Sequence, residues 1–484
     1  MNVSELKKEG LKGSFWNFLT IAVNQVRNFI VSLVLARLLL PSDFGLISMA
    51  MVLNIVLDTF ADFGLSNAII RKETITDDET STIFWLNIIM GASCSILVFL
   101  SAPLFSRYFE MPQLIGIVRV TSLSFFICSF GTLQTALFQR SLDFRSPFIS
   151  RLVSGIVSGI IGIVLAIYNF GVWALVASNL FGWIVYSVMV WLMSSWRPKF
   201  IFHFGKVHDL WVFGWKMTLT TIVNRIFRQL DTLVIGKLYT ATSLGLFERA
   251  RSLNNLVVEY SFSSIRSVML PTLSKLQNDP AALQYSILKL IHVISFLTFL
   301  FAGLMYICAD DLIILLYGEK WVGAIELFKI LGLFSITLCL PVVFDSVMNV
   351  VNKMNLYLWS GVARNAILLI AIPIGLSYGF ITYVWSVSIA RVLGLILYFF
   401  STQLCIKLSV KSQLLAIVRY VIPFLLPLFL WKIIEYNTSF LLLNILIKVL
   451  FYIAIYTGLN FIMRNGGYIT SYTLVRSLML KIRG

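Results

Sequence analysis

The chain has 484 residues, of which 59% are hydrophobic and only 12% are charged, and its mean hydropathy is +0.89. Soluble globular proteins carry about 25% charged residues, so this composition excludes that class and indicates a polytopic membrane protein. The formal net charge of +16 could point to nucleic acid. The basic residues are concentrated in short loops between apolar segments, however, and we expect no nucleic-acid partner.

Apolar segments follow one another along the whole chain, and many reach the length of about 18 residues that can cross a bilayer. The first is not followed by a small-residue cleavage site, so we expect a retained span and not a signal peptide. The sequence therefore predicts an all-α polytopic membrane protein with about 14 transmembrane helices. The predicted spans are residues 15–38, 45–69, 82–105, 115–137, 148–168, 172–194, 211–237, 244–270, 286–308, 324–348, 355–376, 380–402, 414–434 and 439–463.

Lysine and arginine residues in the short loops predict how the chain is oriented. One alternating set of loops carries nearly all of them, for example Arg140, Arg145 and Arg151 in a single loop. The other set contains only Arg107 and Lys320. Because basic loops stay in the cytoplasm and the number of spans is even, we expect both termini to be cytoplasmic.

The sequence contains an internal repeat at a spacing of 200 residues. Residues 19–54 align with 219–254, and 12 of these 36 positions are identical. Shared apolar composition does not explain matches of asparagine, threonine and glycine. The matched pairs of these types are Thr20 with Thr220, Asn24 with Asn224, Gly45 with Gly245 and Asn54 with Asn254.

Two equivalent halves predict two pseudo-symmetric lobes, as in transporters that bind their substrate between matching repeats. We place an N-terminal lobe of six spans at residues 1–200 and a C-terminal lobe of six spans at 201–405. The last pair of spans and a cytoplasmic tail occupy residues 406–484.

Four of the predicted spans carry polar or charged residues along one helical face, at about 100° per residue. A charge at the bilayer centre costs roughly 2.5–3.5 kcal/mol, so such residues normally face a bundle interior or a hydrated cavity. We therefore predict a hydrated central cavity. Its candidate residues are Asn17, Thr20, Asn24, Arg27 and Asn28 in the first span, Asn54, Asp58 and Asp62 in the second, Thr220, Asn224, Arg225, Arg228 and Asp231 in the seventh, and Glu248, Arg251, Asn255 and Glu259 in the eighth.

These residues also have purely structural interpretations. The spacing of Arg228 and Asp231 allows them to neutralise each other, and Arg27 could pair with Asp58 to join two helices. Other lone charges in the spans are expected mainly to form contacts between helices. They are Asp345, Arg364 and Arg391.

No arrangement of residues typical of a catalytic site occurs in the sequence. The longest outer loop, around CADDLIILLYGEKW, is short and half apolar. A membrane polymerase or ligase of lipid-linked sugars would need a larger outer domain, so we disfavour that class and expect no enzyme. A scaffold for envelope assembly would not need the polar faces. The scattered cysteines and histidines show no ligand spacing, and we expect no metal site and no cofactor.

Three segments resemble a known family. LARLLLPSDFGLISMAMVLNIVLDTFADFGLSNAIIRK (35–72) resembles the N-terminal signature of Wzx-type polysaccharide flippases. GLFERARSLNNLVVEYSFSSIRSVMLPTLSKLQND (245–279) resembles the matching segment of their second lobe, and GVWALVAS (171–178) resembles their sixth span. These flippases belong to the multidrug/oligosaccharidyl-lipid/polysaccharide (MOP) exporter superfamily, and the WzxC-like and teichuronic-acid-type branches resemble this chain most.

The resemblance implies two six-helix lobes and a C-terminal helix pair, in a fold like that of MATE and MurJ transporters. Such proteins move an oligosaccharide on undecaprenyl pyrophosphate across the bacterial plasma (inner) membrane by alternating access, for the synthesis and export of exopolysaccharide, O-antigen or teichuronic acid. The expected partners are the lipid-linked oligosaccharide, membrane lipids and polysaccharide polymerase or export proteins. A drug or cation antiporter or a lipid II flippase of the same superfamily is the alternative.

Together with the polar faces, the resemblance assigns roles to the cavity residues. Arg27, Arg225 and Arg228 are expected to bind the pyrophosphate, because guanidinium groups bind phosphate through paired, charge-assisted hydrogen bonds. The asparagine and threonine residues are expected to line the cavity and bind sugar hydroxyls. Coupling to protons or sodium ions would fall to the acidic residues Asp58, Asp62, Asp231 and Glu259.

Overall fold

The computed structural model describes residues 3–62, 69–70, 72, 75–203, 222, 225–434 and 440–483. Within these ranges the regular elements are helices, as the sequence predicts, and no strand occurs. The chain divides into two compact units, Met1–Gly245 and Leu246–Gly484. The lobe boundaries expected from the repeat remain a prediction.

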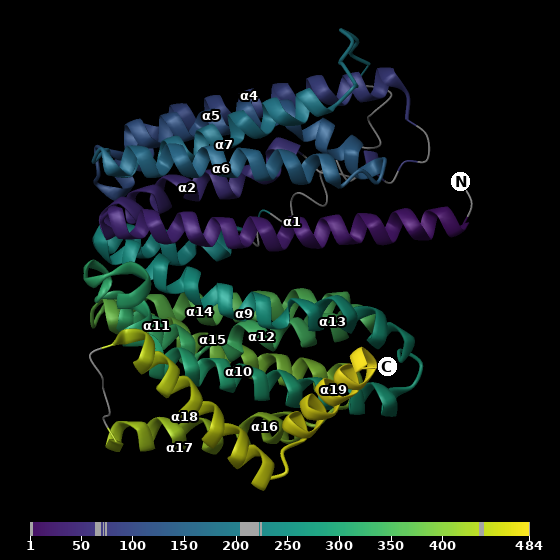
Figure 1. Cartoon of the computed structure of the whole chain (residues 1–484), viewed down its shortest axis with the longest axis vertical. Coiled ribbons are helices and arrows are strands. Elements are labelled where there is room, and N and C mark those ends of the chain that lie inside the picture. Colours follow the sequence, from purple (N-terminus) through teal and green to yellow (C-terminus); the bar gives the residue numbers. More distant parts are fainter. Residues whose placement is uncertain are drawn as a thin grey trace. The chain divides into compact units, whose positions relative to one another are not determined.

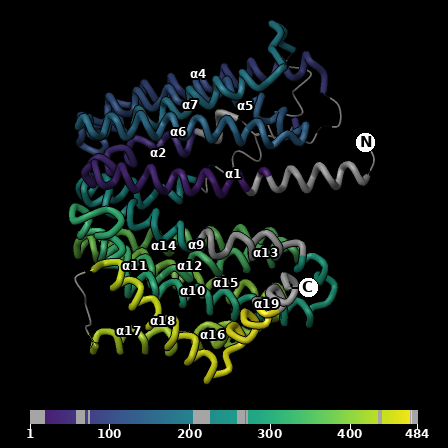
Figure 2. Tube along the Cα trace, viewed as in Figure 1, coloured from purple at the N-terminus to yellow at the C-terminus, as the bar shows by residue number. Residues whose placement is uncertain are grey.

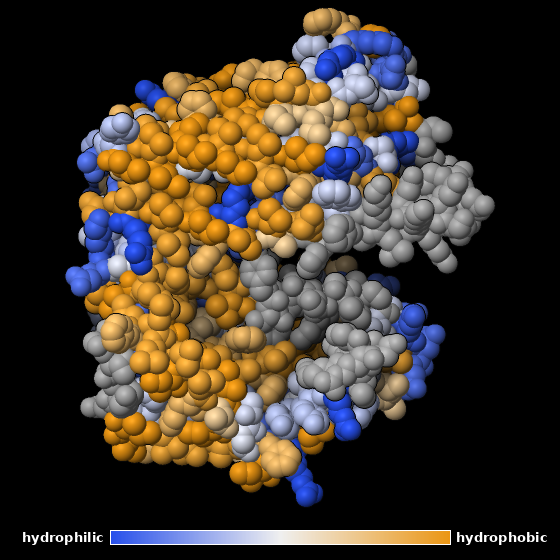
Figure 3. Space-filling view, in the orientation of Figure 1, coloured by the Kyte–Doolittle hydropathy of each residue, from blue (hydrophilic) through white to orange (hydrophobic). Residues whose placement is uncertain are grey.

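Six long helices and the helical residues 225–238 build most of the first unit (Figure 1). Helix α4 packs along α5, α6 packs along α7, and α1 lies against α6. On the visible face of this unit, hydrophobic residues cover the sides of the helices and hydrophilic residues gather near the helix ends (Figure 3). The helices are α1 (Val3–Leu38), α2 (Pro41–Asp62), α4 (Asp77–Phe109), α5 (Leu114–Arg140), α6 (Arg145–Ile167) and α7 (Val172–Met193).

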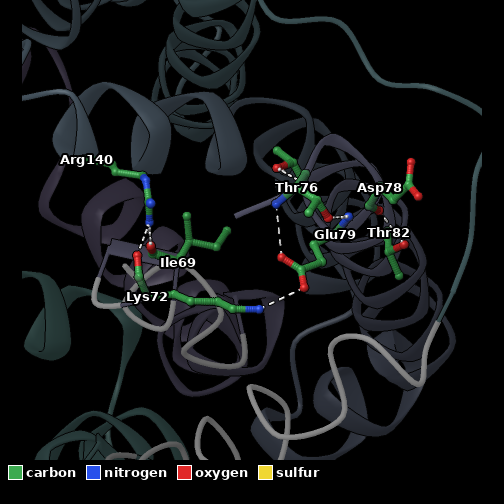
Figure 4. A network of polar contacts seen from close by, with 8 residues as sticks. Ile69, Lys72, Thr76, Asp78, Glu79, Thr82 and Arg140 are labelled. Atoms are coloured by element: carbon green, nitrogen blue, oxygen red, sulfur yellow. Dashed lines mark hydrogen bonds and ion pairs between the residues drawn. The ribbon is translucent and has the colours of Figure 1, made fainter. Parts of the chain in front are cut away.

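The start of α4 is fixed by a capping box and two basic side chains (Figure 4). Thr76 Oγ1 accepts from the Glu79 amide at 3.3 Å, and the Glu79 carboxylate accepts from the Thr76 amide at 3.1 Å. The same carboxylate pairs with Lys72 Nζ at 2.8 Å. Arg140, the last residue of α5, donates to the carbonyls of Lys72 and of Ile69, the latter at 2.6 Å. These contacts tie the segment before α4 to the end of α5.

Helix α10 forms the centre of the second unit, where it contacts α11 and all four C-terminal helices (Figure 2). Helices α14 and α15 form a second closely packed pair. The helices of this unit are α9 (Ala241–Lys275), which begins in the first unit, α10 (Pro280–Tyr317), α11 (Ala324–Leu333), α12 (Ile336–Cys339), α13 (Pro341–Val350), α14 (Met354–Leu376), α15 (Phe380–Ile406), α16 (Val410–Val418), α17 (Val421–Ile434), α18 (Leu441–Ile462) and α19 (Gly466–Arg483), with a 3₁₀ turn at Glu319–Trp321.

A polar stripe fastens α18 to α10. Its five members recur every four residues, and all are buried: Asn444, Lys448, Tyr452, Tyr456 and Asn460. The Tyr452 and Tyr456 hydroxyls donate to backbone carbonyls of α10 at 3.0 and 2.7 Å. Lys448 pairs with the carboxylate of Asp311, which is also buried. The C-terminal helices are therefore bound to α10 by polar contacts as well as by apolar packing.

Most predicted spans coincide with described helices, one of them is bent, and the beginning of 211–237 lies outside the described residues. Ten described helices are long and apolar enough to cross a membrane, or eleven if one bent pair counts as a span. The predicted span 324–348 is that bent pair, since α11 and the segment 336–350 meet at 57°. Pro341 begins α13 just after the bend. The predicted span 414–434 is covered by α16 and α17, which together count as one of the ten spans, and the tail forms α19.

Two glycines matched by the repeat, Gly45 on α2 and Gly245 on α9, each lie against the start of the other helix within the first unit. A Cβ on Gly45 would lie 1.8 Å from the carbonyl oxygen of Ala241, and a Cβ on Gly245 would lie 1.8 Å from that of Pro41. Residues 41 and 241 are themselves matched by the 200-residue spacing. The starts of α2 and α9 therefore touch backbone to backbone in a reciprocal contact that only glycine permits.

Candidate functional site

The polar face of α1 holds its side chains by bonds along the helix. Thr20 Oγ1 donates to the Trp16 carbonyl, and Asn24 Nδ2 donates to the Thr20 carbonyl, each at 2.7 Å. The amide oxygen of Asn24 is buried and has no hydrogen-bond partner among the described residues. The side chain of Asn17 lies outside the described part of the chain.

Arg27 is held against α6 by its guanidinium group. Nη1 donates to the carbonyl of Arg151, and Nη2 donates to Asn28 Oδ1 at 2.8 Å. A Cβ on Gly155 would lie 1.7 Å from Arg27 Nη1, so this glycine leaves the space that the guanidinium occupies. A small hydrophilic patch interrupts the hydrophobic flank between α1 and α6 in Figure 3.

Arg151 itself belongs to a chain of contacts across three helices of the first unit. Arg151 is an exposed residue, and its guanidinium lies over the ring of Tyr186 on α7, with Cζ 5.8 Å from the ring centre. The Tyr186 hydroxyl is 3.0 Å from Thr135 Oγ1 on α5. From the sequence alone, Arg151 is only a basic residue of a loop. In the structure it lies on α6, beside a predicted site residue.

The seventh predicted span supplies Arg225, Arg228 and Asp231 to the described structure. Arg225 Nη1 donates to the carbonyl of Ile55 on α2 at 2.6 Å. Arg228 is exposed and Asp231 is buried. Arg27 and Arg225 thus share one feature, since each guanidinium is held by a backbone carbonyl of a neighbouring helix.

The matched asparagines Asn54 and Asn254 are both buried in contacts between helices. Asn54 Nδ2 donates to the Thr121 carbonyl on α5 at 3.2 Å, and Asn254 Oδ1 accepts from the Ser335 hydroxyl at 3.2 Å. Asn255, the predicted lining residue next to it, is exposed. Asn54 and Asn254 show that polar residues matched by the repeat also take part in packing between helices.

On α9, two of the predicted residues pair with each other, since Glu248 Oε1 lies 3.3 Å from Arg251 Nη1. The remaining predicted residues lie outside the described residues or side chains, and their roles stay predictions. They are Thr220, Asn224, Asp58, Asp62 and Glu259.

The second unit contains a charged cluster built from two of the lone charges. Asp345 Oδ1 on α13 accepts from the Tyr398 hydroxyl on α15 at 2.7 Å. The guanidinium of Arg364 on α14 lies over the ring of Tyr398, with Cζ 4.1 Å from the ring centre. This arrangement agrees with the expectation that these charges form contacts between helices. The tyrosine that joins them was missed, because a lone aromatic residue in an apolar span gives no signal.

The sequence profile of a family described as "Polysaccharide biosynthesis protein" matches residues 34–326, which is more than half of the chain. The chain belongs to this family. Among its relatives is the "Uncharacterized membrane protein in cps region" of Klebsiella pneumoniae, 28% identical over 337 residues, which are 67% of this chain and 68% of that protein. Another is the lipopolysaccharide biosynthesis protein WzxC of Escherichia coli (strain K12), 26% identical over 333 residues and 67% of each chain.

The fold of this family member is that of a solved flippase. The structure of the lipid II flippase MurJ in an inward closed conformation superposes with a TM-score of 0.72, over 94% of this chain and 99% of MurJ, at 16% identity. This likeness confirms the predicted fold class. Together with the family match it identifies a multi-pass membrane protein of a polysaccharide biosynthesis family.

Proposed function

We propose that this protein moves an undecaprenyl-pyrophosphate-linked oligosaccharide from the cytoplasmic to the outer leaflet of the plasma membrane by alternating access. Both termini lie in the cytoplasm in this proposal. The observation that carries it is the position of Arg27, whose guanidinium donates hydrogen bonds to the backbone carbonyl of Arg151 and to Asn28 Oδ1. An arginine kept in a membrane span without a carboxylate among its described partners suits an anionic headgroup.

The proposal divides the substrate among different parts of the protein. Arg27, Arg225 and Arg228 bind the pyrophosphate, and the asparagine and threonine residues of the polar faces bind sugar hydroxyls. The prenyl tail stays in the lipid. Since the substrate only changes leaflet, no covalent step and no cofactor is needed.

Coupling and protein partners complete the proposal. The acidic residues Asp58, Asp62, Asp231 and Glu259 exchange a proton or a sodium ion during return of the empty carrier. Polysaccharide polymerase or export proteins receive the product at the outer face.

The test is transport in proteoliposomes containing an undecaprenyl-pyrophosphate oligosaccharide with a labelled headgroup. Wild type should make the label accessible to a reagent in the opposite compartment, whereas Arg27→Ala and Arg228→Ala should slow this at least about tenfold, the loss expected for one charge-assisted contact. Asp231→Asn should change the dependence on a proton or sodium gradient. Wild-type protein that exports small organic cations and moves no lipid-linked sugar would favour an antiporter instead.

A further inference from the structure

A similar three-residue arrangement occurs among the described residues of each unit. In the first unit it consists of Arg151 over Tyr186, whose hydroxyl meets Thr135. In the second unit Arg364 lies over Tyr398, whose hydroxyl donates to Asp345. The helices correspond in order, because α5, α6 and α7 are the fourth to sixth predicted spans and α13, α14 and α15 are the tenth to twelfth.

The two arrangements differ in charge. The second contains one guanidinium and one carboxylate, so its formal charges cancel. The first has a threonine in place of the carboxylate. It also receives a second cation, because Arg27 donates to the carbonyl of Arg151 and fills the space beside Gly155.

Neither guanidinium of the first unit has a carboxylate partner among the residues that the structure describes. Arg27 bonds to a carbonyl and to Asn28, and Arg151 contacts the ring of Tyr186. Arg27 and Arg151 are in contact through the Arg151 carbonyl, and like charges on neighbouring residues of a membrane-embedded bundle repel each other more strongly than in water. A bound anion removes this cost and gains charge-assisted hydrogen bonds. Access is open, since Arg151 and Asn28 are exposed.

We propose that Arg27 and Arg151 together form a binding site for a doubly charged phosphate group, and that Arg151 is a substrate-binding residue contributed by α6. Tyr186 is a positioning residue that orients Arg151 by contact with its guanidinium. Gly155 positions Arg27 by leaving its side chain room. The equivalent cluster around Arg364 binds no anion, because Asp345 already neutralises it.

Pyrophosphate and ordinary anionic phospholipid share the chemistry that this site recognises. We assign the site to the pyrophosphate of the lipid-linked substrate, and this part of the inference rests on the proposed function. Two guanidinium groups match the higher charge of pyrophosphate better than the single charge of phosphatidylglycerol.

The test is equilibrium binding to the purified full-length protein in nanodiscs of neutral lipid. The probes are undecaprenyl pyrophosphate without sugar, phosphatidylglycerol and inorganic pyrophosphate. Arg27→Gln and Arg151→Gln should each weaken binding of undecaprenyl pyrophosphate about tenfold or more. The double variant should lose less than the product of the two, because both residues bind one group. Arg364→Gln is the matched control from the second unit and should bind within about twofold of wild type.

Each other outcome overturns a stated part of the proposal. Equal losses in Arg151→Gln and Arg364→Gln would show a general effect on the fold and no site. Equally tight binding of phosphatidylglycerol would overturn the pyrophosphate assignment. Asp58→Asn removes the carboxylate that the sequence offers as a partner for Arg27. If this variant unfolds at the same lowered temperature as Arg27→Gln while both bind normally, Arg27 is a structural ion-pair residue.

Binding and transport separate this inference from the proposed function. Arginine-dependent binding without transport by wild type would contradict the flippase and leave the phosphate site standing. Transport with binding that is unchanged in Arg27→Gln and Arg151→Gln would support the flippase and overturn the site. Tyr186→Phe, which keeps the aromatic ring, should bind undecaprenyl pyrophosphate as wild type does, whereas Tyr186→Ala should weaken this binding.

Discussion

The first and second units place an arginine over a tyrosine in the same order of helices, yet they treat its charge differently. In the second unit, Asp345 stands at the tyrosine hydroxyl and balances Arg364. In the first unit, Thr135 takes that place and Arg27 adds a second cation. The comparison shows that the arginine–tyrosine contact alone can join helices. In our proposal, the added carboxylate decides whether the arginine remains available to an anion.

The largest expected effect concerns the compensated charges of the second unit. Lys448→Met should lower the free energy of unfolding by about 3–5 kcal/mol, because it leaves the buried carboxylate of Asp311 unpaired. The double variant Lys448→Met/Asp311→Leu should recover most of this loss. Denaturation in detergent, followed by tryptophan fluorescence, measures both. A single variant as stable as wild type would show that the second unit does not depend on charge compensation.

A pair of tyrosine variants sharpens the comparison directly. Tyr398→Phe should cost about 1.5–3 kcal/mol, because it removes a hydrogen bond to a carboxylate, whereas Tyr186→Phe should cost about 0.5–1.5 kcal/mol, because its partner is a neutral hydroxyl. The same denaturation experiment compares them. Equal costs would mean that Asp345 is not charged in the folded protein.

Glycine variants test the space beside each arginine. Gly155→Ala should reduce transport about tenfold, because the new methyl group would overlap the Arg27 guanidinium, which must leave its seat. Gly394→Ala in the second unit is the control, since its Cβ would lie 3.3 Å from Arg364 Cγ and needs only a small shift. The measurement is the initial rate of transport in proteoliposomes, normalised to the amount of folded protein. Equal rates for Gly155→Ala and Gly394→Ala would contradict this prediction.

The smallest expected effect comes from exchanging the third member of the arrangement. Thr135→Asp gives the first unit the carboxylate of the second and should weaken binding of undecaprenyl pyrophosphate several-fold, on the order of one partly screened ion pair. Thr135→Asn has a similar size without charge and should bind as wild type does. Unchanged binding in the aspartate variant would place the anion away from Arg151.

The sequence predicts the spans well, because length and apolar composition are local properties. It does not predict the bend at Ser335, since that bend involves a contact with Asn254 on another helix. Arg27 could be identified from its helical face. Arg151 could not, because a basic residue at the end of a span is explained equally well by orientation. The stripe from Asn444 to Asn460 was missed although its spacing of four residues is visible in the sequence.

The reciprocal contact of Gly45 and Gly245 has a consequence for how this chain can change. In a symmetric homodimer, one substitution alters both halves of such an interface at once. Here both halves are encoded in a single chain, so one glycine can be substituted while the other is kept. A Cβ at either position would lie 1.8 Å from a backbone oxygen of the opposite helix, so even a single replacement forces the two helix starts apart and disturbs both contacts. The two glycines are therefore constrained jointly, although they are separate positions of one polypeptide.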